Sequence, residues 1–303
     1  MRYAVTGAAG FIGSHLAETL QAAGHEVVGL DCFTDYYDPA LKEENARGLD
    51  VRRVDLAEDA LDFSGVDGVF HLAGRPGVRS FGDVFPLYLR HNVLASQRVF
   101  EAAARDGVRV VFASSSSVYG ATARYPTPED AEPRPLSPYG ITKLACEHLA
   151  EAYVRAFGLD CVTLRYFNAF GPRQRPDMAF TRIAFSLAEG RPFDLYGDGA
   201  QSRSWTYVGD IVAGTVAAME RGVGTYNVGG ALEASMNESI ELLERISGRT
   251  LDVRRHEAVP GDQRRTQADT TRIRGELGWE PRVSLEEGLA RQWDWASARV
   301  GTA

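Results

Sequence analysis

The chain has 303 residues, of which 44% are hydrophobic and 24% are charged, and its net charge is −8 at pH 7. This composition is ordinary for a globular protein and excludes disordered and fibrous classes. The acidic balance argues against nucleic acid and anionic membranes as partners, because both attract a basic surface.

The first residues, MRYAVTGAAGFIGSH, enter a structural pattern without the apolar region or cleavage site of a signal peptide. No stretch of 18 apolar residues follows. The three cysteines, Cys32, Cys146 and Cys161, have neither a paired spacing nor a metal-binding spacing to a histidine. We therefore expect a cytoplasmic protein without a metal site or a disulfide.

Short β-branched runs alternate with amphipathic helical stretches through the first two-thirds of the chain. The runs are RYAVT, EVVGL, VRRVD, GVFHLA, VRVVFASS and CVTLRYF. This alternation predicts an α/β fold with a Rossmann-like, doubly wound parallel sheet and helices on both faces. After residue 171 the pattern weakens, although DIVAGTVAAMERG followed by GTYNVGG again predicts a helix and a strand. We expect one domain over 1–170, which also receives about 206–229, and a smaller α/β domain over 171–205 and 230–303.

A glycine-rich turn joins the first predicted strand to the first helix. Gly7, Gly10 and Gly13 follow RYAVT, and Asp31 ends the next strand. Glycines allow a tight turn and a close backbone approach, and a helix N-terminus offers free N–H groups to a pyrophosphate. A carboxylate at Asp31 would hold the adenosine ribose hydroxyls and repel a 2′-phosphate, which favours NAD over NADP. Asp55, at the end of VRRVD, could lie beside the adenine or simply complete a turn.

Lysine is rare in this chain, which has 31 arginines and only two lysines, Lys42 and Lys143. Lys143 follows Tyr139 by four residues, so on a helix the two side chains lie on one face, one turn apart. A tyrosine hydroxyl is ordinarily protonated at neutral pH, but a neighbouring ammonium and a positively charged nicotinamide both favour the phenolate. The pair is therefore a candidate catalytic base with its cation. The alternative is a Tyr/Lys pair on an exposed helix face.

Serines follow the strand VRVVFASS, at the edge where open α/β sheets bind their ligands. They belong to SSSSVYG, and any one of them could equally satisfy turn amides. The Pro-rich stretch TARYPTPEDAEPRPLSP (122–138) comes next and must form a long irregular loop. Loops of this length in a compact domain are usually functional or disordered.

Several motifs together resemble those of the extended short-chain dehydrogenase/reductase family, in particular its NAD-dependent nucleotide-sugar epimerase and dehydratase branch. They are TGAAGFIG, HLAG, SSSSVYG, SPYGITK, RYFNAFGP and DGAQSRSWTYVGDI, and the likeness continues to ADTTRIRGELGWEPRVSLEEGL near the C-terminus. DCFTDYYDPALK is further similar to the UDP-glucuronate 4-epimerase subgroup. The resemblance implies that the first domain binds the dinucleotide and the second binds a nucleotide sugar. It also implies a homodimer, through the helices before and after SSSSVYG.

The resemblance assigns the site residues. It implies Tyr139 as the base, Lys143 as the cation that favours its phenolate and binds a ribose, and Ser115 as their hydroxyl partner. The implied NAD site consists of Gly7, Gly10, Phe11, Ile12, Gly13, Asp31, Asp55, Leu56, Leu72, Ala73, Asn92, Tyr139 and Lys143. The implied site for a UDP-sugar, or another NDP-sugar, consists of Ser115, Ser116, Asn168, Arg203, Arg264, Arg265 and Thr266.

One position, Val259, departs from the family pattern, and another, Thr266, bears on the size of the sugar. Val259 stands where many relatives have Arg, so Arg264 or Arg265 could replace that contact to the phosphate, or the contact is looser here. Thr266 falls near a position that limits sugar size, and a small residue there leaves room for a bulky substituent such as N-acetyl.

The implied reaction is 4-epimerisation of a UDP-sugar through a transient 4-keto sugar, with NAD regenerated in each cycle. The alternative is a nucleotide-sugar dehydratase. Ser116 and Ser117 stand where 4,6-dehydratases carry Asp and Glu, although Cys146 or Glu147 could supply the proton instead. The segment HLAGRPGVRSF also resembles an epimerase loop more than a dehydratase loop. A non-catalytic NAD-binding sensor is less expected, because such relatives lack the Tyr/Lys pair.

Overall fold

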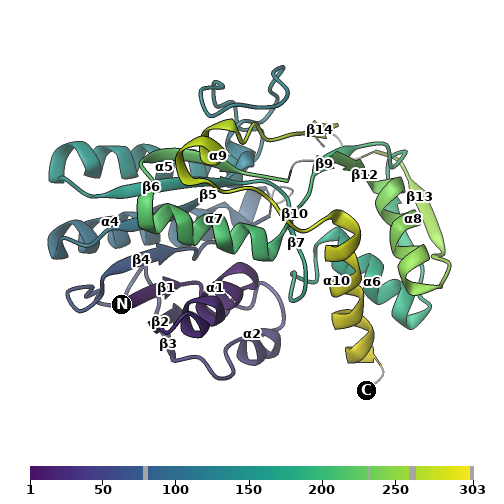
Figure 1. Cartoon of the computed structure of the whole chain (residues 1–303), viewed down its shortest axis with the longest axis horizontal. Coiled ribbons are helices and arrows are strands. Elements are labelled where there is room, and N and C mark those ends of the chain that lie inside the picture. Colours follow the sequence, from purple (N-terminus) through teal and green to yellow (C-terminus); the bar gives the residue numbers. More distant parts are fainter. Residues whose placement is uncertain (78–80, 231–232, 259–263, 301–303) are drawn as a thin grey trace.

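A computed structural model describes residues 1–77, 81–230, 233–258 and 264–300 (Figure 1). Within this part of the chain, a seven-stranded sheet with only parallel pairings fills the larger half of the molecule. Its strands, in spatial order, are β3 (Val51–Arg53), β2 (Glu26–Asp31), β1 (Arg2–Thr6), β4 (Gly68–His71), β5 (Val110–Ser115), β6 (Cys161–Tyr166) and β11 (Gly224–Val228). The order reverses direction between β1 and β4, as in doubly wound sheets. The predicted fold class is confirmed.

Helices cover both faces of this sheet, because successive side chains of a strand point to opposite faces. Tyr3 and Val5 of β1 pack with the helices of one face, whereas Ala4 packs with those of the other. The first group of helices is α1 (Phe11–Ala22), α7 (Val208–Arg221) and α9 (Thr271–Leu277), and the second is α4 (Ala95–Asp106) and α5 (Pro138–Phe157). The strands are therefore buried on both sides, which explains their near-continuous apolar sequences.

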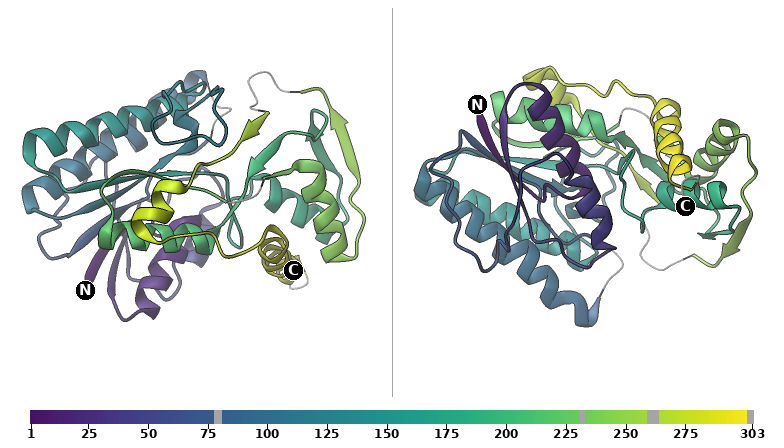
Figure 2. Two further views of the ribbon diagram at one scale, coloured as in Figure 1. Left: turned by 45° about the horizontal axis from the view of Figure 1, so that its top comes forward. Right: turned by 90° about the horizontal axis from the view of Figure 1, so that it is seen from below.

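The smaller half of the molecule lies to the right in Figure 1, is seen from two further directions in Figure 2, and has a hydrophobic core of its own. Phe180, Leu243 and Leu289 lie in this core, each on a different helix. Its elements are α6 (Ala179–Glu189), α8 (Met236–Ser247) and α10 (Leu285–Val300), with the parallel pair β8 (Phe193–Tyr196) and β13 (Val253–His256).

Short strands connect the two halves. β7 (Ala169–Phe170) pairs with β10 (Thr206–Tyr207), and a three-stranded sheet contains β12 (Glu233–Ser235), β9 (Ser202–Ser204) and β14 (Arg265–Thr266) in that order. The remaining elements are α2 (Pro39–Asn45), η1 (Gly82–Val84), α3 (Phe85–Tyr88), η2 (Leu89–Leu94) and η3 (Ser116–Val118). Residues 122–137 contain no helix and only one isolated bridge, between Thr127 and Ala268, as expected of a long irregular loop.

The chain crosses between the halves more often than the sequence indicates. β11 completes the large sheet by pairing with β6. In addition, Ile273, Leu277 and Trp279 pack into the core beneath that sheet, although 230–303 was expected to lie wholly in the smaller domain. The reason is that α9 packs on the edge strand β11 and on α7. No helix in the described ranges is long and apolar enough to cross a membrane.

Candidate active site

The glycine turn after β1 forms one wall of the site. Gly7 has a φ of +71°, and a Cβ added to Gly13 would lie 2.1 Å from the Gly7 carbonyl oxygen, so the first turn of α1 packs directly on the backbone of this loop. α1 begins at Phe11 with Gly10 as its N-cap and without a side-chain cap. Its first N–H groups are therefore left for a bound anion. This cradle fits the pyrophosphate of a dinucleotide.

Asp31 ends β2 beside this turn and is buried. One carboxylate oxygen accepts a hydrogen bond from the Ala9 amide at 3.1 Å, and the other accepts one from the Phe33 amide at 2.8 Å. The carboxylate is thus fixed by backbone donors from both neighbouring loops. Each of its oxygens can still accept from a ligand.

A cavity of about 210 Å³ lies at the carboxyl ends of β1, β2, β4 and β5. It is lined by all the predicted NAD-binding residues except Asn92, namely Gly7, Gly10, Phe11, Ile12, Gly13, Asp31, Asp55, Leu56, Leu72, Ala73, Tyr139 and Lys143. Asp55 also accepts hydrogen bonds from the Ala57 amide and from Arg90, so it both lines the cavity and completes a turn.

Asn92 is fully buried behind the wall of the cavity rather than on it. Its side-chain oxygen accepts from the Arg75 amide at 2.7 Å, and its side-chain nitrogen donates to the Arg75 carbonyl at 3.1 Å. The loop after β4 has no strand neighbour to satisfy these backbone groups, so an amide side chain does so. Asn92 therefore positions the loop that contacts the ligand.

Tyr139 and Lys143 lie one turn apart on α5, and both line the cavity. The helix is started by Ser137, whose hydroxyl accepts from the Gly140 amide at 3.1 Å. The buried Lys143 ammonium donates to the Ala113 carbonyl at the end of β5 at 2.8 Å. A Cβ added to Gly74 would lie 3.3 Å from the Lys143 Nζ atom, so the opposite loop also confines the ammonium.

Of the serines at the end of β5, Ser115 caps the helix that follows and Ser114 lines the cavity. Ser115 is the N-cap of η3: its Oγ accepts from the Ser117 amide at 3.1 Å and lies 3.1 Å from the Ser117 Oγ. Ser114, which the sequence did not single out, lines the cavity and donates to Glu147. The catalytic role of Ser115 and the substrate contact of the half-buried Ser116 stay predictions.

Glu147 belongs to a buried ion pair with Arg165, in which the Nη2 and Oε2 atoms are 2.7 Å apart. Both side chains are less than a tenth exposed. Burial disfavours the guanidinium charge, but Glu147 outweighs this effect, and the pKa of Arg165 is raised. Arg165 also donates to the Tyr119 hydroxyl at 2.8 Å. Neither Glu147 nor Cys146 lines the cavity.

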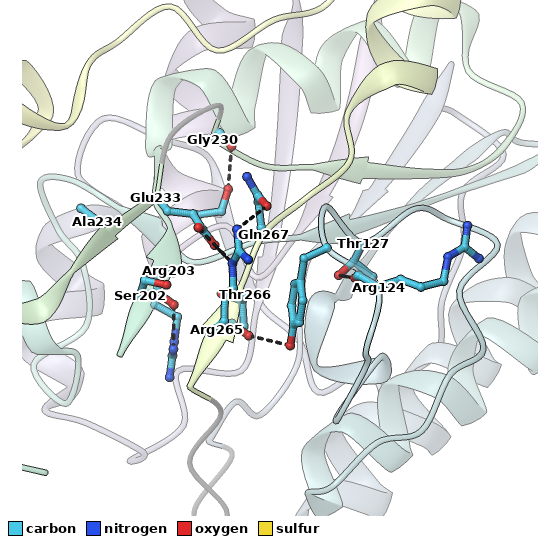
Figure 3. Close-up of polar contacts among 12 residues, drawn as sticks. Arg124, Thr127, Ser202, Arg203, Gly230, Glu233, Ala234, Arg265, Thr266 and Gln267 are labelled. Carbon is cyan, nitrogen blue, oxygen red and sulfur yellow. Dashed lines mark hydrogen bonds and ion pairs between the residues drawn. The ribbon is translucent and has the colours of Figure 1, made fainter. Parts of the chain in front are cut away.

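The predicted sugar-nucleotide residues separate into two groups (Figure 3). β9 lies between β12 and β14, with Arg203 opposite Thr266 and Ser202 opposite Arg265. Directly opposed residues in a sheet share a face, so Arg203 and Thr266 lie on one face and Arg265 lies on the other. Asn168 joins the first group, because its side-chain nitrogen donates to the Thr266 hydroxyl at 2.8 Å.

Arg265 is engaged on its own face of the sheet. Its Nε atom donates to Glu233 at 2.8 Å, and its guanidinium lies 5.1 Å from the centroid of the Tyr125 ring. Figure 3 shows the side chain turned toward Glu233. The alternation of the strand therefore separates Arg265 from Asn168, Arg203 and Thr266. Arg264, the other arginine considered for the diphosphate, is exposed just before β14, and Val259 lies outside the described residues.

The structure adds cavity residues that the sequence did not single out, and Arg175 is one of them. It follows β7 and lines the cavity together with Tyr139. Its Nε atom pairs with Asp177 at 3.0 Å, and its guanidinium lies 5.8 Å from the Tyr36 ring. Burial disfavours the charge of Arg175, but Asp177 and, more weakly, Tyr36 and Tyr139 outweigh it, and its pKa is raised.

Lys42 and Arg75 are the other cations that the sequence did not assign to the cavity. Lysine is rare in this chain, and this rarity, which made Lys143 a candidate site residue, applies equally to Lys42. Arg75 and Arg175 could not be recognised in this way, because the chain has 31 arginines. Within the described ranges, no group of three or more His, Cys, Asp or Glu side chains is arranged to hold a metal ion.

Comparison with known proteins identifies the family. Residues 3–229 match the NAD dependent epimerase/dehydratase family. The UDP-glucuronate 4-epimerase of Thermodesulfobacterium geofontis is 35% identical over 98% of this chain and 97% of its own length. The UDP-glucose 4-epimerase of Mycolicibacterium smegmatis is 37% identical over 96% of this chain and 97% of its own length.

A solved structure agrees over the whole chain. The crystal structure of UDP-glucuronic acid 4-epimerase from Bacillus cereus, in complex with UDP-glucuronic acid and NAD, matches with a TM-score of 0.94 and 39% identity over 99% of this chain and 100% of that one. This likeness confirms the branch that the sequence motifs resemble. The chain belongs to the NAD dependent epimerase/dehydratase family.

Proposed function

We propose that the protein is an NAD-dependent UDP-sugar 4-epimerase that works through a transient 4-keto sugar. One observation carries the proposal: Tyr139 and Lys143 line the same cavity as the glycine turn and Asp31. A proton acceptor and a dinucleotide cradle in one cavity are what reversible oxidation of a sugar alcohol requires. The relatives named above, which cover this chain almost completely, support the same reaction.

The cofactor is NAD, which the described residues fit. The glycine turn and the α1 N-terminus would hold the pyrophosphate, Asp31 would hold the adenosine ribose, and Lys143 would hold the nicotinamide ribose. When bound, NAD supplies the redox chemistry by accepting a hydride from C4 of the sugar and returning it to the opposite face.

The protein's own residues move the proton and orient the sugar. Tyr139, as phenolate, takes the proton of the C4 hydroxyl and later returns it. Lys143 is buried, and its ammonium is fixed by the Ala113 carbonyl one helical turn from Tyr139. Ser115 assists as a hydroxyl partner once the sugar displaces its contact with Ser117. The nucleotide stays anchored by Asn168, Arg203 and Arg264 while the 4-keto sugar turns over.

The placement of two side chains disfavours the dehydratase alternative. Elimination of water needs an acid beside the departing hydroxyl. Ser116 and Ser117 replace the usual acids, and Glu147 is paired with Arg165 outside the cavity lining. Cys146 is buried and does not line the cavity; burial raises the pKa of its thiol, and the Lys143 charge offsets part of that effect. The thiol therefore does not replace the missing acids.

We propose a UDP-hexuronate as the first substrate to test. The proposal rests on the likeness to UDP-glucuronate 4-epimerases and on Arg175, a guanidinium that lines the cavity with Tyr139. A cation at the C4 end of the sugar suits a carboxylate at C6. UDP-glucose and UDP-N-acetylglucosamine are the comparison substrates.

We further propose a homodimer in the cytoplasm, with residues 1–170 and 206–229 as the dinucleotide-binding domain, and with 171–205 and 230–303, apart from the α9 segment that returns to the large sheet, as the sugar-nucleotide domain. Exposed Leu89, Leu94 and Ile141 support the dimer, because they lie on η2 and α5, which contact each other. All three cysteines are free, which is typical of a reducing compartment.

The decisive experiment follows UDP-glucuronate with the purified protein in D2O by NMR and mass spectrometry. We expect the C4 epimer without loss of water, and a Tyr139→Phe variant that retains NAD but turns over at least ~10³-fold more slowly. Loss of 18 mass units would establish the dehydratase instead. Absence of turnover with all three UDP-sugars, together with bound NAD, would favour the sensor.

A further inference from the structure

The long loop between η3 and α5 is attached through its backbone to the chain that follows β14. Thr127, which is buried, forms a parallel bridge with Ala268. Its amide donates to the Gln267 carbonyl at 2.8 Å, and its carbonyl accepts from the Asp269 amide at 2.9 Å. The loop therefore lies beside the strand that carries Thr266 (Figure 3).

Tyr125 makes a second connection, two residues earlier in the same loop. Its hydroxyl donates to the Arg265 carbonyl at 3.2 Å, and the Arg265 guanidinium lies 5.1 Å from the centroid of its ring. A guanidinium at this distance is attracted by the negative face of an aromatic ring. The tyrosine thus contacts both the backbone and the side chain of one β14 residue.

Arg265 also contacts the opposite edge of the three-stranded sheet. β12 and β14 flank β9, with Glu233 opposite Ser204 and Arg265 opposite Ser202. These four side chains share one face, so the arginine and the carboxylate meet above two small serines. The Arg265 Nε atom lies 2.8 and 3.1 Å from the two Glu233 oxygens, and its Nη2 atom donates to Gln267 at 3.0 Å.

Tyr125, Arg265 and Glu233, here called the clasp, join the loop, β14 and β12. β14 has only two residues and, in the part of the chain that the structure describes, pairs only with β9. The loop leads in turn to Ser137, which caps the helix that carries Tyr139. The clasp therefore joins a short edge strand of the smaller half to the start of the catalytic helix.

The clasp is better explained by what it positions than by stability. Arg265 is 46% exposed and Glu233 is 19% exposed, and an ion pair that solvent reaches contributes little to the free energy of unfolding. Thr266, the next residue of β14, lies on the opposite face, where it stands opposite Arg203. Holding Arg265 on one face therefore fixes Thr266 on the other.

We propose that Arg265 is a positioning residue of the sugar-nucleotide site and that the clasp fixes β14 so that Thr266 and Arg203 are presented together to the ligand. The proposal deepens the proposed function and rests on it in taking that face as the sugar-nucleotide site. Without the clasp, binding of the nucleotide would have to order β14 and the loop, and this ordering cost would weaken binding.

The first experiment measures the affinity of the NAD-saturated protein for UDP by isothermal titration calorimetry. We expect Arg265→Met, Glu233→Gln and Tyr125→Leu each to bind UDP about 3- to 10-fold more weakly than wild type. Arg124→Met is the matched control. Arg124 lies on the same loop, pairs with the exposed Asp130 at 3.1 Å and points away from Arg265 in Figure 3, so its loss should change the affinity by less than about twofold.

A double variant, Arg265→Met with Tyr125→Leu, separates positioning from direct contact. If the two side chains act as one clasp, the double variant should bind UDP within about twofold of either single variant, because the first substitution already breaks the connection. If Arg265 touched the diphosphate itself, Tyr125→Leu alone would bind UDP like wild type, and that result would overturn the proposal.

The second experiment follows amide hydrogen exchange, which needs neither nucleotide nor turnover. The amides of Thr127 and Asp269 form the bridge between the loop and the chain after β14. In Arg265→Met they should exchange at least ~5-fold faster than in wild type, whereas the amides of β5 should be unchanged. A general loss of stability would accelerate exchange in β5 as well.

Weaker UDP binding by Arg265→Met with unchanged exchange at Thr127 and Asp269 would identify Arg265 as a direct ligand and overturn the proposal. Faster exchange with unchanged UDP affinity would also overturn it, because the clasp would then have no effect on the site. A protein that binds UDP through the clasp but epimerises no UDP-sugar would contradict the proposed function and leave this inference standing.

Discussion

Gly74 shows how closely the residues around Lys143 are packed. A Cβ added to it would lie 3.1 Å from the Asn92 Oδ1 atom and 3.3 Å from the Lys143 Nζ atom. Neither neighbour can retreat freely, because Asn92 holds the Arg75 backbone and the ammonium is bound to the Ala113 carbonyl. One methyl group at this position therefore displaces the ammonium or the loop.

We predict that Gly74→Ala lowers kcat for the UDP-sugar by about 10- to 100-fold, because small displacements of catalytic groups cost rate steeply. The free energy of unfolding should fall by no more than about 1–2 kcal/mol. Steady-state kinetics and urea unfolding check both expectations.

Gly275→Ala is the matched control for Gly74→Ala. Its added Cβ meets no atom within 4 Å on α9, so it should leave kcat unchanged. A Gly74→Ala enzyme with wild-type kcat would show that Lys143 is not confined as described.

At the scale of secondary-structure elements, the His71 ring links β4 to β1 and to α4 through hydrogen bonds. Its Nδ1 atom lies 2.8 Å from the Thr6 hydroxyl of β1, and its Nε2 atom lies 2.9 Å from the Ser96 hydroxyl of α4. The ring is fully buried, and burial, with a smaller effect of the Lys143 charge, lowers the pKa of His71 to about 3. The native protein thus holds this histidine neutral.

A pH dependence of stability follows from the lowered pKa of His71. An unfolded histidine titrates near pH 6.5, so below that pH the unfolded chain takes up a proton that the native protein excludes. The contribution of His71 to the free energy of unfolding is complete above pH 6.5 and is lost as the pH falls from 6.5 toward 3. The loss is on the order of a few kcal/mol.

Urea unfolding at pH 7, 6, 5 and 4 measures this dependence. We predict a shallower decline of the unfolding free energy for His71→Gln than for wild type over this range. A substitution of the exposed His148 by Gln controls for the loss of a histidine as such. Parallel declines for wild type and His71→Gln would contradict the assignment of His71 as a neutral buried group.

Element-scale patterns also explain what the sequence could and could not predict. The doubly wound sheet was predictable because each strand is an apolar run with turn residues at its ends, and the glycine turn is local in sequence. The separation of Arg265 from Arg203 was not predictable, because it depends on the register of β14 against β9, which pairs residues 63 positions apart. Motif spacing places residues along the chain but does not show which face of a strand they occupy.

The same distinction applies to the site. Residues near Tyr139 and the glycine turn lie in contiguous motifs and nearly all line the cavity. Ser115 lies in an equally recognisable motif, and Asn92 was assigned by the resemblance, yet their polar atoms satisfy neighbouring backbone groups. Arg175 follows β7, which pairs with β10, and it lines the cavity with Tyr139 from 36 positions further along the chain, which no local pattern indicates.

At the scale of the whole molecule, exposed apolar side chains on η2 and α5 are candidates for a contact between two copies of the chain. Leu89 and Leu94 on η2 are 44% and 45% exposed, and Ile141 on α5 is 51% exposed. The two helices contact each other, and exposed apolar side chains on neighbouring elements are typical of an interface. A second copy of the chain can cover this surface symmetrically.

We predict a dimer by sedimentation velocity for wild type and at least ~10-fold weaker association for Leu94→Glu, because a buried charge in an interface is costly. Val223→Glu is the control, since Val223 is 70% exposed between α7 and β11, away from this surface. Equal dimerisation of both variants would place the contact elsewhere.

The return of α9 to the large sheet limits how the protein can be divided. Ile273, Leu277 and Trp279 fill the core beside α7, and the Trp279 indole donates to the Asp210 carbonyl at 2.9 Å. A fragment that stops near residue 230 would therefore expose the α7 side of that core to water. The two halves are separate in shape but share one folding unit, so neither is a self-sufficient module for grafting onto another enzyme.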